Sequence, residues 1–215
     1  FLGGSLKPTQ QIDNFRLGDN ISRAKVAVKP KGIDGDFILS VGTIEARKNH
    51  LLLYYLQKKI LSSGKEPTPI VLAGRKGWLT SDLQYLIEHD AEVQKYLKIY
   101  DNLSDSELRW AYENCLLTIT PSFYEGWGLP IAESLAYGKV TLSSNTSSMT
   151  EIGGKSVDYF SPYSVDELEK LVTVYDNPGT LKKREKYIVE NYSPVSWDEA
   201  AKQFDTKVSR MLSSL

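Results

Sequence analysis

Residues 115–144, CLLTITPSFYEGWGLPIAESLAYGKVTLSS, carry the pattern that decides the fold. The segment opens with a short apolar run at 115–120 and closes with a second predicted strand at 139–144. Between them, residues 130–138 have helical character and end in glycine, a common stop signal for helices. A strand, a helix and a strand in this order form a β-α-β unit, which joins parallel strands. The loop at 121–129 therefore leads from the carboxyl end of a buried strand into a helix.

The same alternation continues on both sides of this segment. The apolar spacing in 49–64 and 80–96 predicts helices, and a Ser-x-x-Glu capping box at 104–107 opens another helix that runs through Asn114. Further strands are predicted at 36–42, 69–74, 97–100 and 157–160, with a possible edge strand at 24–28 and capping boxes for late helices at 164–167 and 196–199. Helices alternating with short apolar runs are typical of α/β folds. The sequence thus predicts a Rossmann-like parallel sheet of about six strands, flanked by helices and followed by a helical C-terminal tail.

Three segments follow from the change in composition along the chain. Residues 1–35, rich in Gly, Lys, Pro and Asp, are predicted to form an interdomain connection. Residues 36–195 are predicted to form the Rossmann-like domain, and 196–215 its C-terminal helix. The start FLGGSLKP has no initial methionine and no signal-peptide pattern, so we expect a piece of a longer protein.

The overall composition narrows the function classes. A net charge of −1 provides no field that would recruit nucleic acid, so an anion site has to be built locally. The single cysteine excludes an intrachain disulfide and favours a reducing compartment, and two distant histidines make a zinc site improbable. No apolar run approaches the ~20 residues of a membrane span. We expect a cytoplasmic location, alone or as a full-length protein bound peripherally to the inner face of the membrane.

Two basic loops follow the first two predicted strands. GTIEARKN, residues 42–49, places Arg47 and Lys48 at the start of a helix, where exposed N–H groups and the helix dipole favour an anion. GRKGW, residues 74–78, places Arg75 beside a second lysine after the next strand. Each loop alone could be a solvated pair of cations. Because the carboxyl ends of parallel strands share one edge of the sheet, the two loops together indicate a ligand site there.

The third loop, YEGWGLP, lies on the same edge and is flanked by two carboxylates. Glu125 precedes the helix and Glu133 is expected in its first turn, while Gly126 and Gly128 leave the backbone open to a ligand. Glu133 could instead only favour the helix dipole, worth ~0.3–1 kcal/mol. Carboxylates are good hydrogen-bond acceptors for vicinal hydroxyls but poor ligands for phosphate. Two of them beside basic loops therefore suggest a ligand with sugars on both sides of a phosphate.

Other nucleotide-binding classes lack their motifs here. No Gly-x-Gly-x-x-Gly follows the first strand, no P-loop consensus occurs and no Gly-x-Ser-x-Gly is present. A nicotinamide dehydrogenase, a P-loop NTPase and an α/β-hydrolase are therefore disfavoured. The DGD sequence at 34–36 has the letters of a metal motif but precedes the first strand, so we assign it to a turn.

Four motifs in this order resemble the carboxyl-terminal half of family-4 retaining glycosyltransferases of the GT-B fold. They are SVGTIEARKNH, VLAGRKGW, PSFYEGWGLPIAESLAYG and SSNTSSMTEIGG, and SWDEAAKQF is similar to the family's final helix. The resemblance runs from about Asp36 to the end and includes the Glu-x7-Glu pair, Glu125 and Glu133. It implies a donor-binding domain that transfers a hexose from a nucleotide sugar with retention of configuration. The sequences of the basic loops are most similar to those of bacterial polysaccharide or O-antigen mannosyltransferases that use GDP-mannose. A UDP-sugar is an alternative donor.

The resemblance also implies roles for individual residues. Arg47 and Lys48 would hold the diphosphate and stabilise it as leaving group, without a metal or cofactor. Glu125 would hold the donor sugar near the reacting carbon, and Glu133 would bind the ribose. The other substrate-binding residues it implies are Gly42, Thr43, Arg75, Tyr100, Gly126, Trp127, Gly128 and Leu129. Thr43 stands where relatives often have arginine, which places more of the phosphate binding on Lys48.

An acceptor, a glycan or lipid-linked glycan, would bind through an amino-terminal domain outside this chain, so the fragment is expected to hold donor but transfer poorly. Two alternatives stay open from the sequence. One is a GT-B epimerase or phosphorylase, although no signature of a pyridoxal phosphate lysine is visible. The other is a non-catalytic nucleotide-sugar-binding or regulatory α/β module, for which loss of Glu133 would have no consequence.

Overall fold

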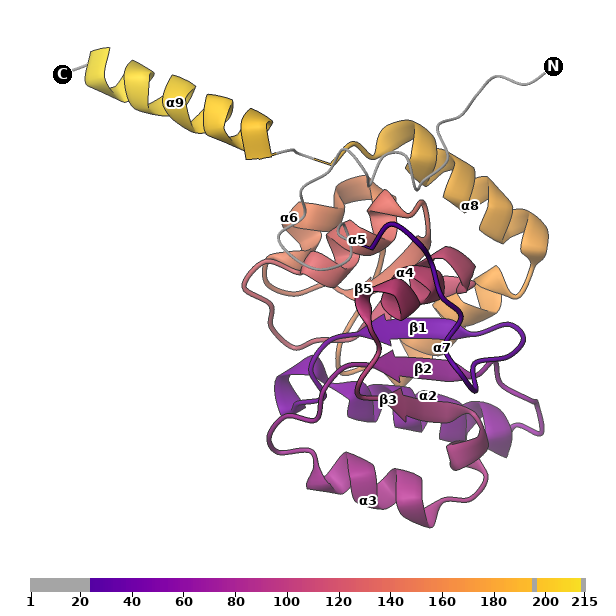
Figure 1. Ribbon diagram of the computed structural model, residues 1–215. Coiled ribbons are helices and arrows are strands. Elements are labelled where there is room, and N and C mark those ends of the chain that lie inside the picture. The colour runs from indigo at the N-terminus through magenta and orange to yellow at the C-terminus, as the bar shows by residue number, and fades with distance from the viewer. Residues whose placement is uncertain (1–23, 195–196, 214–215) are drawn as a thin grey trace.

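A computed structural model describes residues 24–194 and 197–213. Its centre is a six-stranded sheet in the order β3-β2-β1-β4-β5-β6, in which every neighbouring pair is parallel (Figure 1). The strands are β1 (Ile38–Val41), β2 (Ile70–Ala73), β3 (Leu97–Tyr100), β4 (Leu117–Thr120), β5 (Val140–Ser144) and β6 (Asp158–Phe160). The predicted Rossmann-like sheet of about six strands is confirmed.

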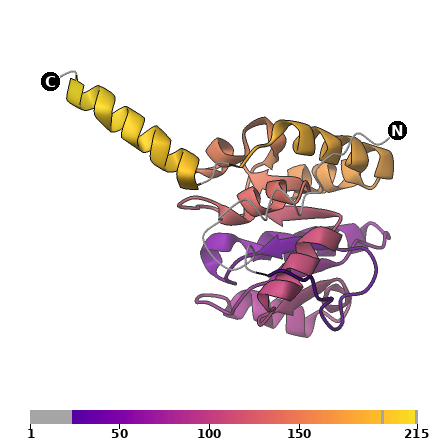
Figure 2. The same cartoon turned by 45° about the horizontal axis from the view of Figure 1, so that its top comes forward.

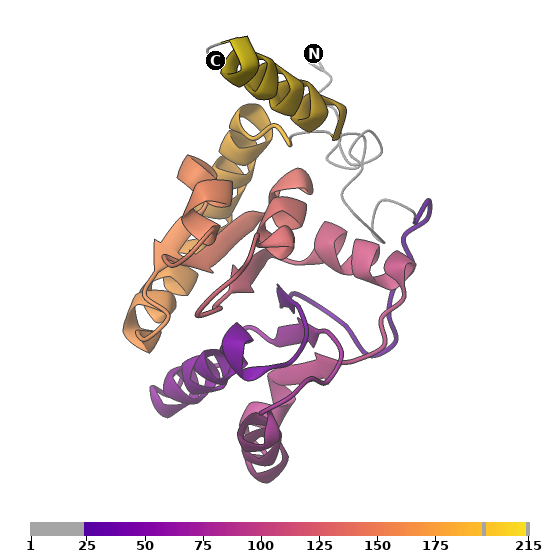
Figure 3. The ribbon, with the colours of Figure 1, turned by 90° about the vertical axis from the view of Figure 1, so that its left-hand side faces the viewer.

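Helices cover both faces of the sheet (Figures 1 and 3). One face carries α2 (His50–Ser62), α3 (Ser81–His89) and α7 (Val165–Tyr175). The other carries α4 (Asp105–Asn114), α5 (Leu129–Ala136) and α8 (Pro178–Asn191), with the short α6 (Met149–Gly153) packed against α5. Three single 3-10 turns, η2 (Ala46–Lys48), η3 (Val93–Lys95) and η4 (Gly154–Ser156), complete the layered part.

The order of the strands reverses between β1 and β4, which are neighbours at the centre of the sheet. Ile38 of β1 aligns with Ile70 of β2 on one side and with Leu117 of β4 on the other. The connection leaving β1 therefore runs to one side of the sheet and the connection leaving β4 to the other. In open α/β sheets the carboxyl ends of two such strands form the ligand-binding crevice. The loops 42–49 and 121–128 meet at this place.

Side chains of the strands belong to two buried apolar clusters. Leu72 and Ile119 are fully buried in the larger cluster, which includes Leu53 and Leu56 of α2, whereas Leu39 belongs to the second. Its cluster also contains Phe37, Ala111, Tyr112 and Tyr137. Burying a side chain of this size stabilises the fold by about 1.5–3 kcal/mol. The two cores therefore fix the strand ends from which the three predicted ligand loops emerge.

The helix predicted at 80–96 is interrupted. Helix α3 ends at His89, and Asp90 adopts an extended conformation before η3 begins. The Asp90 carboxylate accepts hydrogen bonds from the backbone N–H of Val93 and from Lys58 and Tyr54 of α2. These contacts with a different helix hold the break, which local apolar spacing does not reveal.

Both capping boxes that fall on described residues mark helix starts, but only the first is complete. Ser104 and Glu107 bond to each other's backbone N–H groups at the start of α4, as predicted. Ser164 accepts from the N–H of Glu167 at the start of α7, whereas the Glu167 carboxylate accepts from Ser161 instead. The box expected at Ser196 lies outside the described residues.

The edge strand considered at 24–28 is wrong. The N–H of Val28 donates to the carbonyl of Ser106 in α4, so this segment bonds to a helix start and the sheet edges are β3 and β6. Ala24 and Ile33 are nevertheless buried, and Asp34 of the DGD sequence pairs with Lys29. The division of the chain at residue 35 stays a prediction.

Helix α9 (Trp197–Ser213) confirms a helix at the C-terminal end of the described residues. It projects beyond the layered body in Figures 1 and 2. Exposed apolar side chains lie along one side of it at helical spacing: Phe204, Val208, Met211 and Leu212. Its assignment to the same domain stays a prediction. No helix of the described residues is both long enough and apolar enough to cross a membrane.

Candidate functional site: a buried carboxylate holding two cations

Glu125 is the centre of a buried polar cluster at the carboxyl ends of β1 and β4. Its Oε1 accepts hydrogen bonds from Lys48 Nζ at 2.6 Å and from Ser122 Oγ at 2.7 Å. Its Oε2 accepts from Arg47 at 2.9 Å. The side chains of Glu125 and Lys48 are only 7% and 10% exposed, whereas that of Arg47 is 42% exposed. The structure therefore brings together the three residues predicted as catalytic.

The loop after β1 presents both cations to Glu125. Gly42 has φ of 145°, and a Cβ there would lie 3.1 Å from both Cε and Nζ of Lys48. Glycine at this position thus leaves room for the lysine. Arg47 and Lys48 form the 3-10 turn η2, and Asn49 follows with a left-handed φ of 55° before α2 begins.

Electrostatics keep this cluster charged at neutral pH. Burial alone would raise the pKa of Glu125, but hydrogen bonds from Lys48, Ser122 and Arg47 outweigh it and hold the pKa below its ordinary value of 4.5. His50 lies beside the cluster, and its burial, followed by the charge of Lys48, lowers its pKa from 6.5 to about 3. At pH 7 Glu125 is therefore ionised and the His50 imidazole is neutral.

The cluster has hydrogen-bond capacity beyond its internal contacts. Glu125 uses one of the three N–H donors of the Lys48 ammonium, and Arg47 also donates to Glu45 and to the carbonyl of Tyr124. A further acceptor at the Lys48 nitrogen is therefore compatible with the observed geometry. Partly exposed Arg47 and nearly buried Lys48 together suit an anion that enters from the open edge of the sheet.

The loop from 125 to 129 is held by serines that follow β5. Ser147 accepts from the N–H of Glu125, and the hydroxyls of Ser147 and Ser148 donate to its carbonyl at 2.9 Å. Gly128 has φ of 100° at the start of α5, so glycine is needed there for the turn into the helix. A Cβ on Gly126 would meet no atom within 4 Å, so that glycine leaves open space.

Glu133 lies in the second turn of α5, whereas the sequence predicted it in the first turn. Its Oε2 accepts a hydrogen bond of 2.8 Å from the hydroxyl of Tyr112, which is fully buried. Burial raises the pKa of Glu133, while the Tyr112 bond and the charge of Lys48 oppose that rise. Lys48 therefore acts electrostatically on both glutamates of the pair.

The remaining predicted residues surround this cluster or lie away from it. Thr43 and Arg75 are exposed on loops that pair through the backbone, because Ile44 donates to the Arg75 carbonyl at 2.8 Å. Trp127 and Leu129 are 62% and 41% exposed on the loop before α5. Tyr100 is half-buried, and a Cβ added at Gly32 would lie 3.3 Å from its hydroxyl. Among the described residues of the predicted set, side-chain hydrogen bonds join Arg47 and Lys48 to Glu125.

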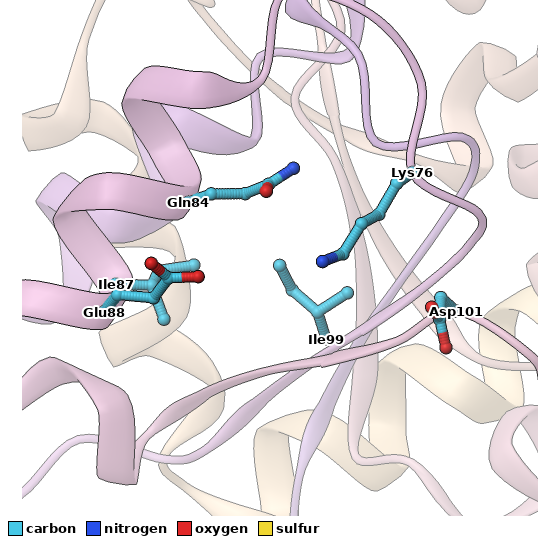
Figure 4. A pocket seen from close by; sticks show the side chains of 6 residues that line it. All are labelled: Lys76, Gln84, Ile87, Glu88, Ile99 and Asp101. Atoms are coloured by element: carbon cyan, nitrogen blue, oxygen red, sulfur yellow. The ribbon is translucent and has the colours of Figure 1, made fainter.

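A separate cavity of about 230 Å³ opens beside α3 (Figure 4). It is lined by Lys76, Gln84, Ile87, Glu88, Ile99 and Asp101. Neither Glu125 nor Glu133 is among these lining residues, so the cavity is distinct from the cluster around Glu125.

Several side chains of the site were not predicted. Ser122, Tyr112 and Ser147 bond directly to the two glutamates or their backbone. Ser122 is part of the PSFYEGWGLP motif and Ser147 part of SSNTSSMTEIGG, so the motifs contained them without indicating a role. Tyr112 has no such signal. Among the described residues no group of three or more His, Cys, Asp or Glu side chains is placed to hold a metal ion.

Comparison with known proteins identifies the group to which this arrangement belongs. The family model described as "Glycosyl transferases group 1" matches residues 23–193. The chain belongs to this family. Similar solved structures share the fold of this chain, and at their level of identity they show the fold alone. A glycosyltransferase from Rickettsia africae ESF-5 has a TM-score of 0.69 and 18% identity, over 85% of this chain and 49% of that one. A sucrose-phosphate synthase from Thermosynechococcus elongatus has a TM-score of 0.64 and 19% identity, over 85% of this chain and 47% of that one.

Relatives of this group 1 chain include mannosyltransferases from Escherichia coli. An "O-antigen chain mannosyltransferase B" is 30% identical over 132 residues, covering 61% of this chain and 34% of that protein. A "Serotype-specific mannosyltransferase WbdA" is 26% identical over 205 residues, covering 94% of this chain and 25% of that protein. The chain thus spans about a third or less of the length of these relatives.

Proposed function

We propose that this chain is the donor-binding part of a glycosyltransferase that moves mannose from GDP-mannose to a glycan or lipid-linked glycan acceptor. Transfer proceeds with retention of configuration and without a metal or cofactor. The observation that carries the proposal is the Arg47–Glu125–Lys48 cluster. It lies where the connections that leave β1 and β4 run to opposite sides of the sheet. Such a position at the carboxyl edge of a parallel sheet is where α/β proteins bind nucleotides.

In this proposal the two cations bind the diphosphate. Arg47 and Lys48 neutralise the charge that develops on the leaving nucleoside diphosphate, which is the contribution expected of positioned donors in a water-poor site. Glu125 keeps both cations oriented in the free protein and faces the donor sugar in the complex. Its buried ion pair with Lys48 ensures that the ammonium is in place before the ligand arrives.

Glu133 is proposed to bind the ribose. Tyr112 occupies Oε2 of its carboxylate, so Oε1 can accept from ribose hydroxyls. The preference for mannose and for the GDP nucleotide is supported by the names of the two Escherichia coli relatives and by the basic-loop motifs. The acceptor is proposed to bind between this edge of the sheet and an amino-terminal domain of a longer protein. A cytoplasmic location is in keeping with the single buried cysteine, Cys115.

The proposal is tested by calorimetry of this chain with GDP, GDP-mannose, UDP and UDP-glucose. We expect saturable binding of GDP and GDP-mannose and weaker binding of the uridine ligands. A ligand at a hundredfold excess over Kd should stabilise the fold by about 2.7 kcal/mol, which thermal unfolding would register. Binding of UDP-glucose above GDP-mannose would contradict the mannose assignment, and no response to any of the four would contradict the donor-domain assignment.

A further inference from the structure

We propose that Phe123 and Tyr163 form a stacking platform for a pyranose ring of the acceptor glycan. The two aromatic rings lie side by side beside the candidate site, with centroids 5.3 Å apart and planes tilted by 32°. Phe123 is 38% exposed and Tyr163 is 80% exposed. The pair therefore presents ring surface to the outside at the edge of the sheet where the proposed donor binds. This inference rests on the function proposed above.

Buried contacts fix the pair in place. Phe123 follows β4 and Tyr163 follows β6, so the two residues come from different loops. The side-chain amide of buried Asn49 donates to the carbonyls of Pro121 at 3.0 Å and Pro162 at 2.9 Å, which joins those loops. These bonds order the backbone of the two loops that carry the rings, so less loop order has to be gained on binding, which favours a ligand contact.

The platform adjoins the cation cluster. The N–H of Phe123 donates to the backbone carbonyl of Arg47 at 2.9 Å, and the hydroxyl of Thr146 donates to the Phe123 carbonyl at 3.0 Å. The Arg47 side chain reaches Glu125 from the same turn. A sugar seated on the two rings would therefore lie next to the place proposed for the donor sugar.

A pyranose ring fits the size and chemistry of this surface better than a protein partner does. The C–H bonds of a pyranose ring can pack against an aromatic ring, while the hydroxyls around its rim need hydrogen-bond partners. The exposed Tyr163 hydroxyl supplies one such partner. Two aromatic side chains cover far less than the ~800 Å² per partner of a stable protein interface.

Saturation-transfer NMR on this chain tests the platform with methyl α-D-mannopyranoside and an α-linked mannotriose as probes. The variants are Tyr163→Ala and the double variant Phe123→Ala/Tyr163→Ala. Tyr85→Ala is the matched control, because Tyr85 is 61% exposed on α3 and stacks on His89 away from the platform. A thermal unfolding scan establishes that each variant is folded, and a GDP titration is recorded for each.

We expect mannotriose to bind the wild type and Tyr85→Ala equally, and Tyr163→Ala about fivefold more weakly, as loss of one aromatic contact typically gives. GDP should bind all of these proteins equally. Equal mannotriose signals for wild type and Tyr163→Ala, or no signal from the wild type, would overturn the inference. If GDP still binds in that case, the donor-domain proposal stands; if GDP binds none of the proteins, the donor-domain proposal fails as well.

Discussion

Replacing Glu125 by glutamine tests whether this carboxylate holds the two cations. The variant keeps the shape of the side chain but removes the charge that pairs with Lys48 at 2.6 Å and with Arg47 at 2.9 Å. The amide nitrogen of glutamine is a donor, so it cannot accept from one of the two cations. Removing one partner of a buried ion pair typically costs about 3–5 kcal/mol. Arg47 is 42% exposed and can regain water, which places the expected loss near the lower limit, about 3 kcal/mol.

Urea unfolding at pH 7 measures this loss, and thermal unfolding should show a Tm lowered by about 6–12 °C for a chain of this size. Asp34→Asn is the matched control, because it makes the same carboxyl-to-amide change in a pair with Lys29 whose side chains are 51% and 80% exposed. Exposed pairs contribute less than about 1 kcal/mol. Equal destabilisation by Glu125→Gln and Asp34→Asn would refute the claim that Glu125 organises the cluster.

Two further predictions concern neighbours of the cluster. Tyr112→Phe removes the 2.8 Å hydrogen bond to Glu133 and should weaken GDP binding without changing the affinity for inorganic pyrophosphate. Calorimetry measures both affinities. An equal loss for both ligands would contradict the ribose role of Glu133. His50 has a folded-state pKa of about 3, below its ordinary 6.5, so the unfolded chain takes up a proton first as the pH falls. Stability should therefore decrease by up to about 1.4 kcal/mol per pH unit between these values, and His50→Gln should reduce that slope in urea unfolding, whereas an unchanged slope would assign it to other groups.

Much of the fold was predictable because it depends on local patterns. Each strand lies within a segment predicted as a strand, and β1, β2 and β4 are almost fully buried because inner strands of a parallel sheet are covered on both faces. The loop after β1 was a candidate anion site because it places two cations at a helix start beyond a predicted strand. The same pair could have been solvated, so the roles predicted for Arg47 and Lys48 came from the family resemblance.

What the sequence did not predict depends on contacts between distant residues. Tyr112 reaches Glu133 from a different helix, and Asn49 joins loops that lie 72 and 113 residues away. The end of α3 depends on Lys58, which bonds to Asp90 from α2. In each case a side chain forms a hydrogen bond with a residue that is distant in the sequence and lies nearby only in the folded domain. Local spacing therefore identified the loops of the site but not the residues that hold them.

The most direct measurement is the Kd of GDP for Lys48→Met by calorimetry. Methionine keeps the apolar stem of Lys48 and removes the ammonium that contacts Glu125. A hydrogen bond to a charged group is worth about 1.5–3 kcal/mol, so GDP binding should weaken roughly 10- to 100-fold. Lys186→Met is the control, because Lys186 is 75% exposed on α8. The account predicts wild-type affinity for Lys186→Met and the large loss for Lys48→Met; equal GDP affinity in both variants would contradict it.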